Sequence, residues 1–369
     1  MKISRLDEAR QLIQGQLAGI LGRLGLAELA TELTVDEPTE AGHGELTTNI
    51  ALKAAKAAHK APAILAREMA DAWPTLEAVE RIEVAGPGFL NFTLKTAWLA
   101  EVVHEVAQKA AEYGRSASGN NQRVLIEFVS ANPVGPLVIV NGRAAAVGDS
   151  LARIMRAAGY QADREFYVNN AGNQIKTLGQ AMWLRWREMQ GDAVENDWPE
   201  GVYPGEYVKD AVKAYIAAHP DFHADAPSDA LYETLGQFGS VIFRRQHEDV
   251  LRRFGVEFDH WTYEKDLRDQ HKPEQIIDTL RSRGLVYDQD GAVWFASTRL
   301  GDDKDRVLVK SDGLYTYFVP DAAYHAEKFA RGYDRVIDLL GPDHHGYIGR
   351  MRALVQALGY DADQLEILI

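Results

Sequence analysis

The first residues with an evident chemical use lie in the loop 130–141, between a predicted buried strand and a predicted helix. The strand spans residues 123–129, a near-continuous apolar run with one charge, and the helix spans residues 142–158. Free backbone N–H groups and the helix dipole at such a junction favour a nucleotide phosphate, and Asn141 is placed to cap the helix. Because many α/β proteins have such a turn without a ligand, the loop alone leaves a phosphate site and a plain turn both open.

Metal chemistry has little support in the sequence. His344 and His345 are adjacent, but no second ligand pair stands at a recognisable spacing. The chain has no cysteine, which excludes disulfides, thiol catalysis and Cys-ligated zinc. Neither G-x-G-x-x-G nor G-x-x-x-x-G-K-[ST] occurs, so a Rossmann dinucleotide site and a P-loop also lack support. We therefore expect no protein-bound metal.

The elements around this loop predict an α/β domain. The first strand and helix are followed by a strand at residues 163–168, which completes a right-handed βαβ unit. A mainly helical stretch covers residues 173–285, a later buried strand covers 336–341, and a helix covers 347–358. This order predicts a parallel sheet with helical residues inserted in it.

The N-terminal part of the chain has a different pattern and predicts a small α+β domain over residues 1–115. Two short strands, residues 81–85 and 89–94, are separated by a Gly-Pro-Gly turn and surrounded by amphipathic helices. The polar segment 114–121 has no apolar period and is interpreted as the linker to a second domain, residues 116–369.

Composition limits the class of protein. The 369 residues are 46% apolar and 25% charged, which is typical of a globular protein of two or three domains. No apolar run approaches the roughly 20 residues that cross a bilayer, and the N-terminus lacks the apolar core of a signal peptide. We expect no membrane partner and residence in the cytoplasm. The formal charge of −14 disfavours a general salt-driven grip on nucleic acid but leaves a local basic patch open.

Beyond these patterns, the chain resembles the class I arginyl-tRNA synthetases across its whole length. Matching segments occur in the order and spacing of that family. They are HGELTTNIALKAAK (43–56), VAGPGFLNFTL (84–94), EFVSANPVGPL (127–137), GRAAAVGDSLARIMRAAGY (142–160), EFYVNNAGNQI (165–175), FGVEFDHW (254–261), GDDKDRVLVKSDGLYTYFVPDAAYH (301–325) and GPDHHGYIGRM (341–351).

The resemblance implies a fold and an activity. It implies a Rossmann-like (HUP-type) catalytic core with an inserted helical subdomain, preceded by an additional domain that contacts the tRNA elbow. The family uses ATP with Mg²⁺ to activate L-arginine and then transfers it to tRNA-Arg. ATP, L-arginine and tRNA-Arg are therefore the expected partners.

The resemblance also implies an arginine site. Glu127 and Asn132 correspond to residues that help to hold arginine, Tyr317 and Asp321 fall where the family reads the guanidinium, and Ser130 belongs to the same segment. A carboxylate matches the planar fork of a guanidinium with charge-assisted bonds, which suits this ligand. On the residues alone, Glu127 could be a strand-end charge at the surface, and Asp321 could be a helix N-cap.

The nucleotide side departs from the family. Its adenylation signature, His-x-Gly-His, is replaced by Val138, Ile139, Val140 and Asn141. Both imidazoles that would donate to the ATP phosphates are absent, and Val140 puts a branched side chain where adenine needs a glycine. We expect ATP binding to be impaired. The residues that the resemblance places on this side are Pro133, Gly135, Val138, Val140, Asn141, Gly142, His344 and His345.

The sequence ends at Leu368 and Ile369, just before the family's Lys-Met-Ser-Lys loop would begin. That loop and the helical anticodon-binding domain after it are expected to be absent. Both departures affect adenylation, so the sequence predicts an arginyl-tRNA synthetase-type protein with weak or no adenylation activity. The alternatives are a truncated, non-catalytic paralogue or fragment that binds arginine, tRNA or a partner protein, and a ligase for another substrate.

Overall fold

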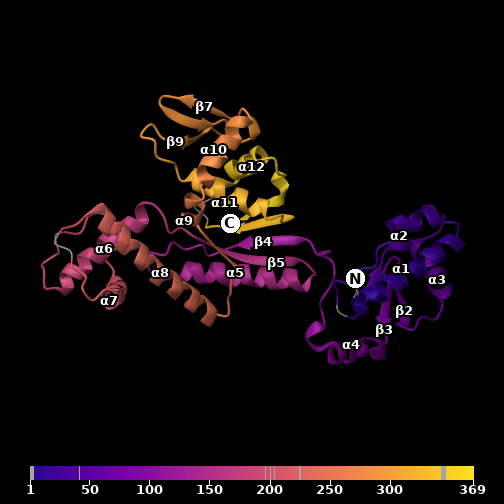
Figure 1. The fold of residues 1–369 in the computed structure, drawn as a ribbon. Coiled ribbons are helices and arrows are strands. Elements are labelled where there is room, and N and C mark those ends of the chain that lie inside the picture. The colour runs from indigo at the N-terminus through magenta and orange to yellow at the C-terminus, as the bar shows by residue number, and fades with distance from the viewer. Residues whose placement is uncertain are drawn as a thin grey trace. The chain divides into compact units, whose positions relative to one another are not determined.

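The computed structural model describes residues 4–40, 42–195, 197–199, 201–202, 204–223, 226–341 and 346–369. The chain forms two compact units, Met1–Ser116 and Ala117–Ile369 (Figure 1). Each unit has its own apolar core, and among the described residues no core cluster draws side chains from both units.

The N-terminal unit packs helices around a three-stranded antiparallel sheet of order β1-β3-β2. The helix α1 buries Ile13, Leu17 and Ile20 at helical spacing, and Ser4 caps it by accepting a hydrogen bond from the N–H of Asp7 at 3.1 Å. The elements are α1 (Arg5–Arg23), a 3₁₀ turn (Ala27–Glu32), β1 (Leu46–Thr48), α2 (Ile50–Ala54), α3 (Pro62–Asp71), β2 (Val79–Ala85), β3 (Phe89–Leu94), α4 (Thr96–Lys109) and a 3₁₀ turn (Ala110–Glu112).

The second unit is built on a five-stranded parallel sheet of order β11-β10-β4-β5-β6. This arrangement confirms the predicted α/β class with a parallel sheet. Its sheet strands and the helices that cover it are β4 (Arg123–Glu127), α5 (Ile139–Ala157), β5 (Gln161–Val168), β6 (His260–Tyr263), α9 (Glu264–Asp269), α10 (Lys272–Ser282), α11 (Phe318–Ala330), β10 (Arg335–Leu339), α12 (Tyr347–Ala357), a 3₁₀ turn (Ala362–Gln364) and β11 (Leu365–Leu368).

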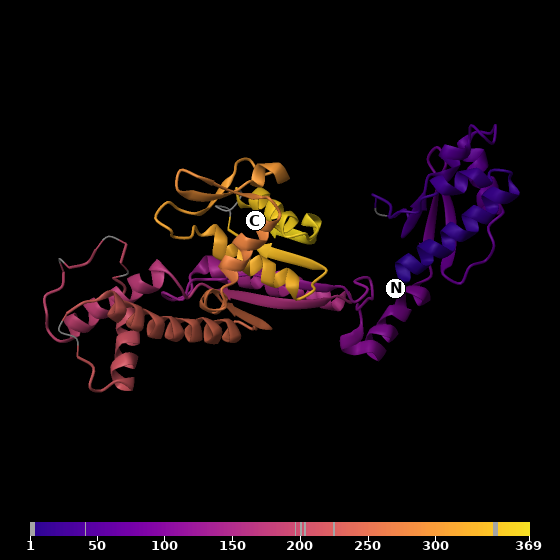
Figure 2. The same ribbon diagram turned by 45° about the horizontal axis from the view of Figure 1, so that its top comes forward.

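Helices cover both faces of this sheet. Figures 1 and 2 show α5 along one face, with α11 and α12 on the other. The helix α5 approaches closely because Gly148 has no side chain: a Cβ there would lie 2.2 Å from the ring of Phe128. Burial on both faces explains why the strands read as near-continuous apolar runs in the sequence.

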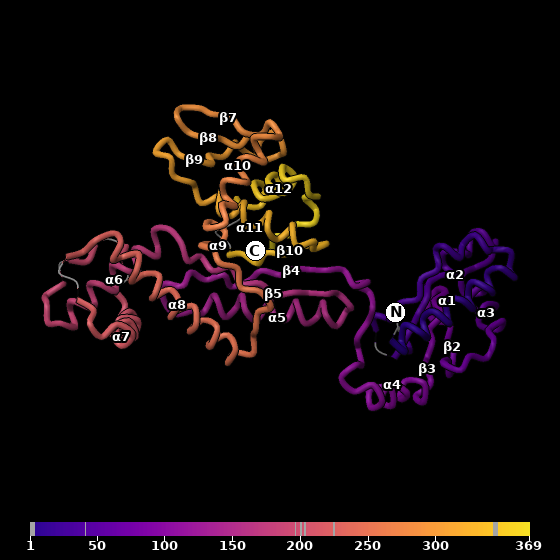
Figure 3. The backbone as a smooth tube through the Cα atoms, in the orientation of Figure 1, coloured from indigo at the N-terminus to yellow at the C-terminus, as the bar shows by residue number. Residues whose placement is uncertain are grey.

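Two smaller groups of elements are inserted between β5 and β10. One is helical and consists of α6 (Asn173–Met189), α7 (Val208–Ala218) and α8 (Asp229–Arg253); the other is an antiparallel sheet (Figure 3). The strands of that sheet are β7 (Val286–Gln289), β8 (Ala292–Phe295) and β9 (Arg306–Val309), with a 3₁₀ turn at Ser297–Leu300. The sequence predicted the helical insertion but neither this sheet nor the strand β6 within the predicted helical stretch.

The loop after β4 differs from its prediction at both ends. The strand stops at Glu127 because Val129 and Ser130 have positive φ angles of 70° and 40°, which no strand accommodates. The helix α5 begins at Ile139, three residues before the predicted start, so Asn141 lies inside its first turn and is not the N-cap. The loop is therefore shorter than the sequence suggested, and its backbone is strained where it leaves the sheet.

Candidate active site

The strand order identifies where this sheet can bind a ligand. From β4 the chain proceeds to β5 and β6 on one side, whereas β10 and β11 lie on the other side. The order therefore reverses between β4 and β10, and the carboxyl ends of parallel strands at such a switch point form the usual ligand crevice. Glu127 and Asp338 are neighbours in register at these two strand ends.

A buried ionic cluster lies behind this crevice. It consists of Glu127, Lys328, Asp338 and His325. The ammonium of Lys328 is fully buried, contacts the carboxylate of Glu127 and donates to Oδ1 of Asp338 at 2.7 Å. Nε2 of His325 lies 2.8 Å from Oδ2 of Asp338, and its Nδ1 lies 2.9 Å from the carbonyl oxygen of Asp321. The cluster ties α11 to β4 and β10.

Mutual attraction favours the charge on three members of the cluster, whereas burial, together with Asp338, raises the pKa of Glu127 against the opposition of Lys328. Burial alone would lower the pKa of Lys328, but Asp338 and Glu127 outweigh burial and raise it. Burial and Lys328 oppose the charge on His325, yet Asp338 and Asp321 raise its pKa to about 9. Burial would raise the pKa of Asp338, and Lys328 and His325 lower it instead. His325 is therefore a cation at neutral pH, with both ring nitrogens facing acceptors.

A hollow of about 230 Å³, here called the acidic hollow, opens beside this cluster at the ends of β5 and β6. Its two carboxylates are Glu264, directly after β6, and Asp321, in the first turn of α11. Tyr167 and Tyr317 supply aromatic surface. The lining residues are Tyr167, Asn169, Ala171, Gly172, Asn173, Gln174, Glu264, Arg268, Tyr317, Pro320 and Asp321.

Glu264 is buried and extensively hydrogen-bonded. Its Oε1 accepts from Nε and Nη2 of Arg268 at 2.8 and 2.6 Å, and its Oε2 accepts from the hydroxyl of Tyr167 at 3.1 Å. Burial and then the charge of Glu264 raise the pKa of Tyr167 well above its ordinary value, so the phenol stays a neutral donor. The ring of Tyr167 stacks on the ring of Tyr324, with 4.2 Å between the ring centroids, and this stacking fixes the position of Tyr167.

Two of the five predicted arginine-site residues line the acidic hollow, and a third contacts one of its lining residues. Tyr317 and Asp321 line it, and Asn132 donates to the side chain of Gln174, another lining residue, at 2.7 Å. Asp321 is the fourth residue of α11 and not its N-cap, so the alternative reading of this carboxylate is wrong.

Glu127 and Ser130 do not line the hollow. Ser130 Oγ donates to Glu127 at 2.7 Å and accepts from the N–H of Tyr167 at 3.1 Å, so the pair lies behind the Tyr167 backbone. Glu127 is buried and paired with Lys328, which excludes its reading as a surface charge at a strand end.

Sequence reasoning missed several lining residues, above all Glu264 and Arg268. A signal was present, because a polar residue directly after a parallel strand points to the ligand edge of the sheet. That signal could not be used while residues 173–285 were predicted to be mainly helical, since β6 lies within them.

Two of the eight predicted nucleotide-side residues, Val140 and Asn141, line a second hollow of about 330 Å³, here called the apolar hollow. It lies at the ends of β4, β10 and β11, against the first turns of α5, and its lining is mostly aliphatic. Val140 lines it, and Val138 and Ile139 beside it are exposed, Ile139 by 93%. The lining residues are Val129, Val140, Asn141, Arg143, Ala144, Val147, Leu339, Leu340, Gly341, Leu368 and Ile369.

The remaining nucleotide-side residues have varied surroundings. Asn141 Oδ1 accepts from the N–H of Val138 at 2.9 Å, which occupies one of the free donors at the start of α5. Gly135 faces the helical insertion, where its carbonyl oxygen lies 2.7 Å from Nε2 of His247. Pro133 is buried in the same loop, and Gly142 has open space beside it. His344 and His345 lie outside the described residues.

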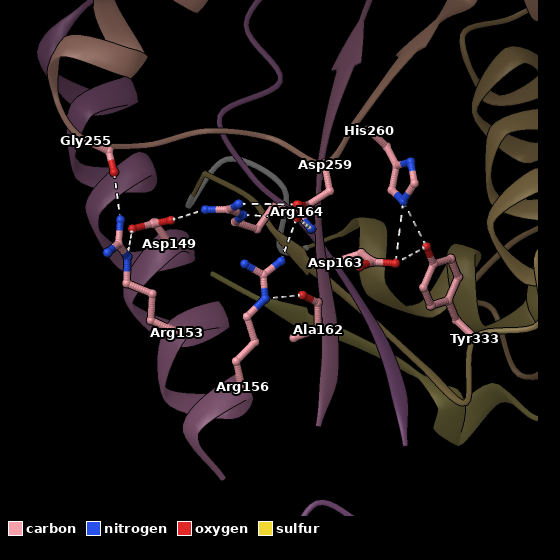
Figure 4. A network of polar contacts seen from close by, with 10 residues as sticks. All are labelled: Asp149, Arg153, Arg156, Ala162, Asp163, Arg164, Gly255, Asp259, His260 and Tyr333. Atoms are coloured by element: carbon pink, nitrogen blue, oxygen red, sulfur yellow. Dashed lines mark hydrogen bonds and ion pairs between the residues drawn. The ribbon is translucent and has the colours of Figure 1, made fainter. Parts of the chain in front are cut away.

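A surface ionic network fixes α5 against the sheet (Figure 4). Arg164 of β5 donates to Asp149 of α5 at 2.9 Å and to Asp259 at 3.0 Å, and Arg156 of α5 donates to Asp259 at 2.7 Å. Burial would raise the pKa of Asp259, but hydrogen bonds from Arg164 lower it. The network joins the middle and the C-terminal end of α5 to β5 and to the residue before β6.

Within the described ranges, no three histidine or carboxylate side chains are grouped to hold a metal ion. No helix in the part of the chain that the structure describes is both long and apolar enough to span a membrane.

Family models match both units. The model of the arginyl tRNA synthetase N-terminal domain matches residues 7–94, and the model of the class I (R) tRNA synthetase catalytic domain matches residues 241–368. The chain is also 45% identical to an arginine–tRNA ligase of Symbiobacterium thermophilum over 363 residues, 98% of this chain and 64% of that relative. The chain belongs to the arginyl-tRNA synthetase family.

Further members of this family agree with the assignment. An arginine–tRNA ligase of Halalkalibacterium halodurans is 41% identical over 373 residues, covering 100% of this chain and 66% of that relative. A solved structure from Campylobacter jejuni, assigned to the arginyl-tRNA synthetases, is 34% identical with a TM-score of 0.69 and covers 75% of this chain and 60% of its own. The chain thus spans less than two thirds of the length of these family members.

Proposed function

We propose that this chain carries the arginine-activating site of an arginine–tRNA ligase, in which arginine reacts with ATP and is then transferred to tRNA-Arg. The observation that carries the proposal is the acidic hollow, where Glu264 and Asp321 lie with two tyrosines at the carboxyl ends of parallel strands. Two carboxylates in one hollow suit a planar cation with several donors better than they suit a neutral side chain.

The positions of the two hollows support this reaction. The acidic hollow lies at the β5 and β6 ends, and the apolar hollow lies at the β4, β10 and β11 ends, so they are neighbours along one edge of the sheet. An arginine with its guanidinium in the first hollow would point its α-carboxylate towards a nucleotide in the second. Adenylate formation needs that carboxylate beside the α-phosphate.

The nucleotide side supports slow adenylation. Residues 138–141 offer an anion the backbone N–H groups of the α5 N-terminus but no cationic or imidazole donor. Val140 also lines the apolar hollow, where its side chain takes up space beside a planar base. ATP with Mg²⁺ is the proposed co-substrate, and these residues fit its adenine and phosphates poorly. Binding of arginine without adenylation is the second candidate, favoured by the exposed side chains of Val138 and Ile139.

Calorimetry with L-arginine and L-citrulline tests the first part of the proposal. Citrulline has nearly the same shape but lacks the charge, so the protein should bind arginine at least about tenfold more tightly. Asp321→Asn should remove about the same factor. Glu327→Gln is the matched control, because Glu327 is on the same helix and pairs with Lys272 away from this hollow. Equal affinity for both ligands would exclude guanidinium recognition.

ATP binding tests the second part. The triple variant Val138→His, Val140→Gly, Asn141→His restores the family signature. It should bind ATP at least about tenfold more tightly, because each restored charge-assisted donor adds up to a few kcal/mol of binding free energy. Asn141→His alone is the control, since it removes the contact to the Val138 N–H without clearing the hollow. Robust ATP–pyrophosphate exchange by the unaltered protein would refute the proposal that adenylation is slow.

The remaining partners follow from the family assignment. We propose that the N-terminal unit contacts tRNA-Arg, since it matches the family's N-terminal domain model. The cytoplasm is the proposed compartment, in line with the cysteine-free composition. Binding of tRNA-Arg, measured by gel shift with and without residues 1–116, tests the first point.

A further inference from the structure

The acidic hollow already contains a guanidinium, that of Arg268. Its Nε and Nη2 both donate to Oε1 of Glu264, at 2.8 and 2.6 Å, and Arg268 is one of the residues that line the hollow. The proposed ligand of this hollow carries the same chemical group. The protein's own side chain therefore holds one of the two carboxylates that an arginine would use.

Glu264 has no acceptor capacity left for a ligand. Oε1 takes both Arg268 donors, and Oε2 takes the hydroxyl of Tyr167 at 3.1 Å. With its amide nitrogen turned towards Glu264, Asn169 donates to Oε2 at 3.0 Å as well. A carboxylate offers about four lone-pair positions, so a ligand can bind Glu264 only if one of these donors leaves.

Arg268 is the donor that can leave most easily. Tyr167 is held by its stacking on Tyr324 and by burial, whereas the Arg268 side chain is 37% exposed. Arg268 and Glu264 are four residues apart on α9, a helix of only six residues. The Arg268 end of this pair reaches solvent, whereas Glu264 is buried, so breaking the pair is inexpensive only when another cation takes the place of Arg268.

We propose that Arg268 is an internal competitor for the guanidinium site, which a bound arginine displaces from Glu264. The inference rests on the proposed function, because it concerns the same hollow and the same ligand. In the empty state, Arg268 neutralises Glu264, and Asp321, whose Oδ1 lies 3.5 Å from Nδ1 of His325, is the second carboxylate of the hollow. On binding, the ligand guanidinium replaces the Arg268 guanidinium, and the number of buried charge-assisted bonds is conserved.

The competition sets the affinity of the site. Displacing Arg268 from Glu264 costs free energy, which offsets part of the attraction between the ligand and Glu264. The unaltered protein therefore binds arginine more weakly than the two carboxylates would allow. Removing Arg268 should therefore tighten binding, which is the opposite of the effect of removing a residue that supports the site.

The test compares Arg268→Met with the unaltered chain by calorimetry with L-arginine. We expect the variant to bind roughly three- to tenfold more tightly, and to melt at a somewhat lower temperature without ligand because the buried Glu264 loses its cationic partner. Lys265→Met is the matched control. It removes the same charge from the same helix, but Lys265 pairs with Asp269 and does not line the hollow, so its affinity should change less than about twofold.

A second pair of variants tests whether Arg268→Met tightens arginine binding through Glu264. In the background of Glu264→Gln, the further change Arg268→Met should give no gain, because there is no carboxylate to release. If the unaltered chain binds arginine and Arg268→Met binds it equally or more weakly, the competitor role is overturned and the proposed function stands. If neither protein prefers arginine to citrulline, both fail.

Discussion

Lys328 is a single side chain on which two buried carboxylates depend. Its ammonium is fully buried between Glu127 and Asp338, and the attraction of both keeps it charged. Removing one member of a buried ion cluster leaves uncompensated charge in a medium of low dielectric constant. This residue therefore contributes to stability through its partners more than through its own contacts.

Lys328→Met should lower the free energy of unfolding by about 3–5 kcal/mol at neutral pH. The loss should be smaller in mild acid, where a carboxylate left without its partner can take up a proton. Urea denaturation followed by circular dichroism measures both values. Lys304→Met, at an exposed position, is the control and should stay within about 0.5 kcal/mol. A loss below about 1 kcal/mol for Lys328→Met would contradict this description of the cluster.

His325 should make stability depend on pH in a specific range. Its pKa is raised from 6.5 to about 9 in the folded protein, chiefly by Asp338 against the opposition of burial and Lys328. A raised pKa gives stabilisation that is complete below pH 6.5 and is lost as the pH rises towards 9. The loss is on the order of 3 kcal/mol at about 1.4 kcal/mol per pKa unit.

The variant His325→Gln isolates this effect, because glutamine can donate to Asp338 without carrying charge. The difference in unfolding free energy between the unaltered protein and the variant should shrink as the pH rises from 6.5 to 9. A difference that does not change over this range would show that His325 is neutral in the folded protein.

For single side chains, the sequence predicts which residues belong to the site better than it predicts which side chains touch one another. Family motifs located Tyr317 and Asp321, and both line the acidic hollow. The same motifs grouped Glu127 with them, although Glu127 pairs with Lys328, 201 positions further along the chain. Such a pair is formed by the way α11 crosses the sheet, and no local pattern encodes it.

Among the elements, the helices α6 and α8 show how glycine determines packing. A Cβ on Gly179 would lie 1.7 Å from the carbonyl oxygen of Tyr232, and one on Gly236 would lie 2.0 Å from that of Ile175. Backbone meets backbone at both positions, so neither helix can move aside locally. These two helices support the loop that carries Asn132, through its contact with Gln174 of α6.

Gly236→Ala should therefore destabilise the second unit by about 1–3 kcal/mol or more, although alanine is the better helix former. Gly142→Ala is the matched control, because Gly142 is also helical and has nothing within 4 Å of an added Cβ. The control should be neutral or should stabilise by up to about 1 kcal/mol. Equal effects of the two substitutions on thermal unfolding would show that α6 and α8 do not pack this closely.

The elements themselves were predicted where periodicity is strong and missed where elements are short. The βαβ unit and the last helix follow the sequence closely, because buried strands and amphipathic helices have distinct periods. The four-residue strand β6 and the sheet β7–β9 are too short for a period to develop, and long-range pairing decides them. This is why Glu264, at the end of β6, was not found.

Among the described residues, every apolar core belongs to one of the two units, and no core is shared between them. The core that includes Ile13, Leu46 and Phe92 draws only on the first unit, and the cores around the parallel sheet draw only on the second. A change of composition near residues 114–121 indicated such a division. In the structure, the boundary between the two compact units falls after Ser116. Units with separate cores can fold separately.

Fragments 1–116 and 117–369 should therefore each unfold cooperatively, with melting temperatures within a few degrees of the corresponding transitions of the intact chain. Circular dichroism and calorimetry measure this, and Trp73 and Trp98 report the first unit. Fragment 160–369 is the control: it lacks β4, the central strand of the five-stranded sheet, and should not melt cooperatively. If fragment 117–369 also melted without cooperativity, the second unit would need the first to fold. The acidic hollow, whose lining residues all lie after residue 166, would then depend on both.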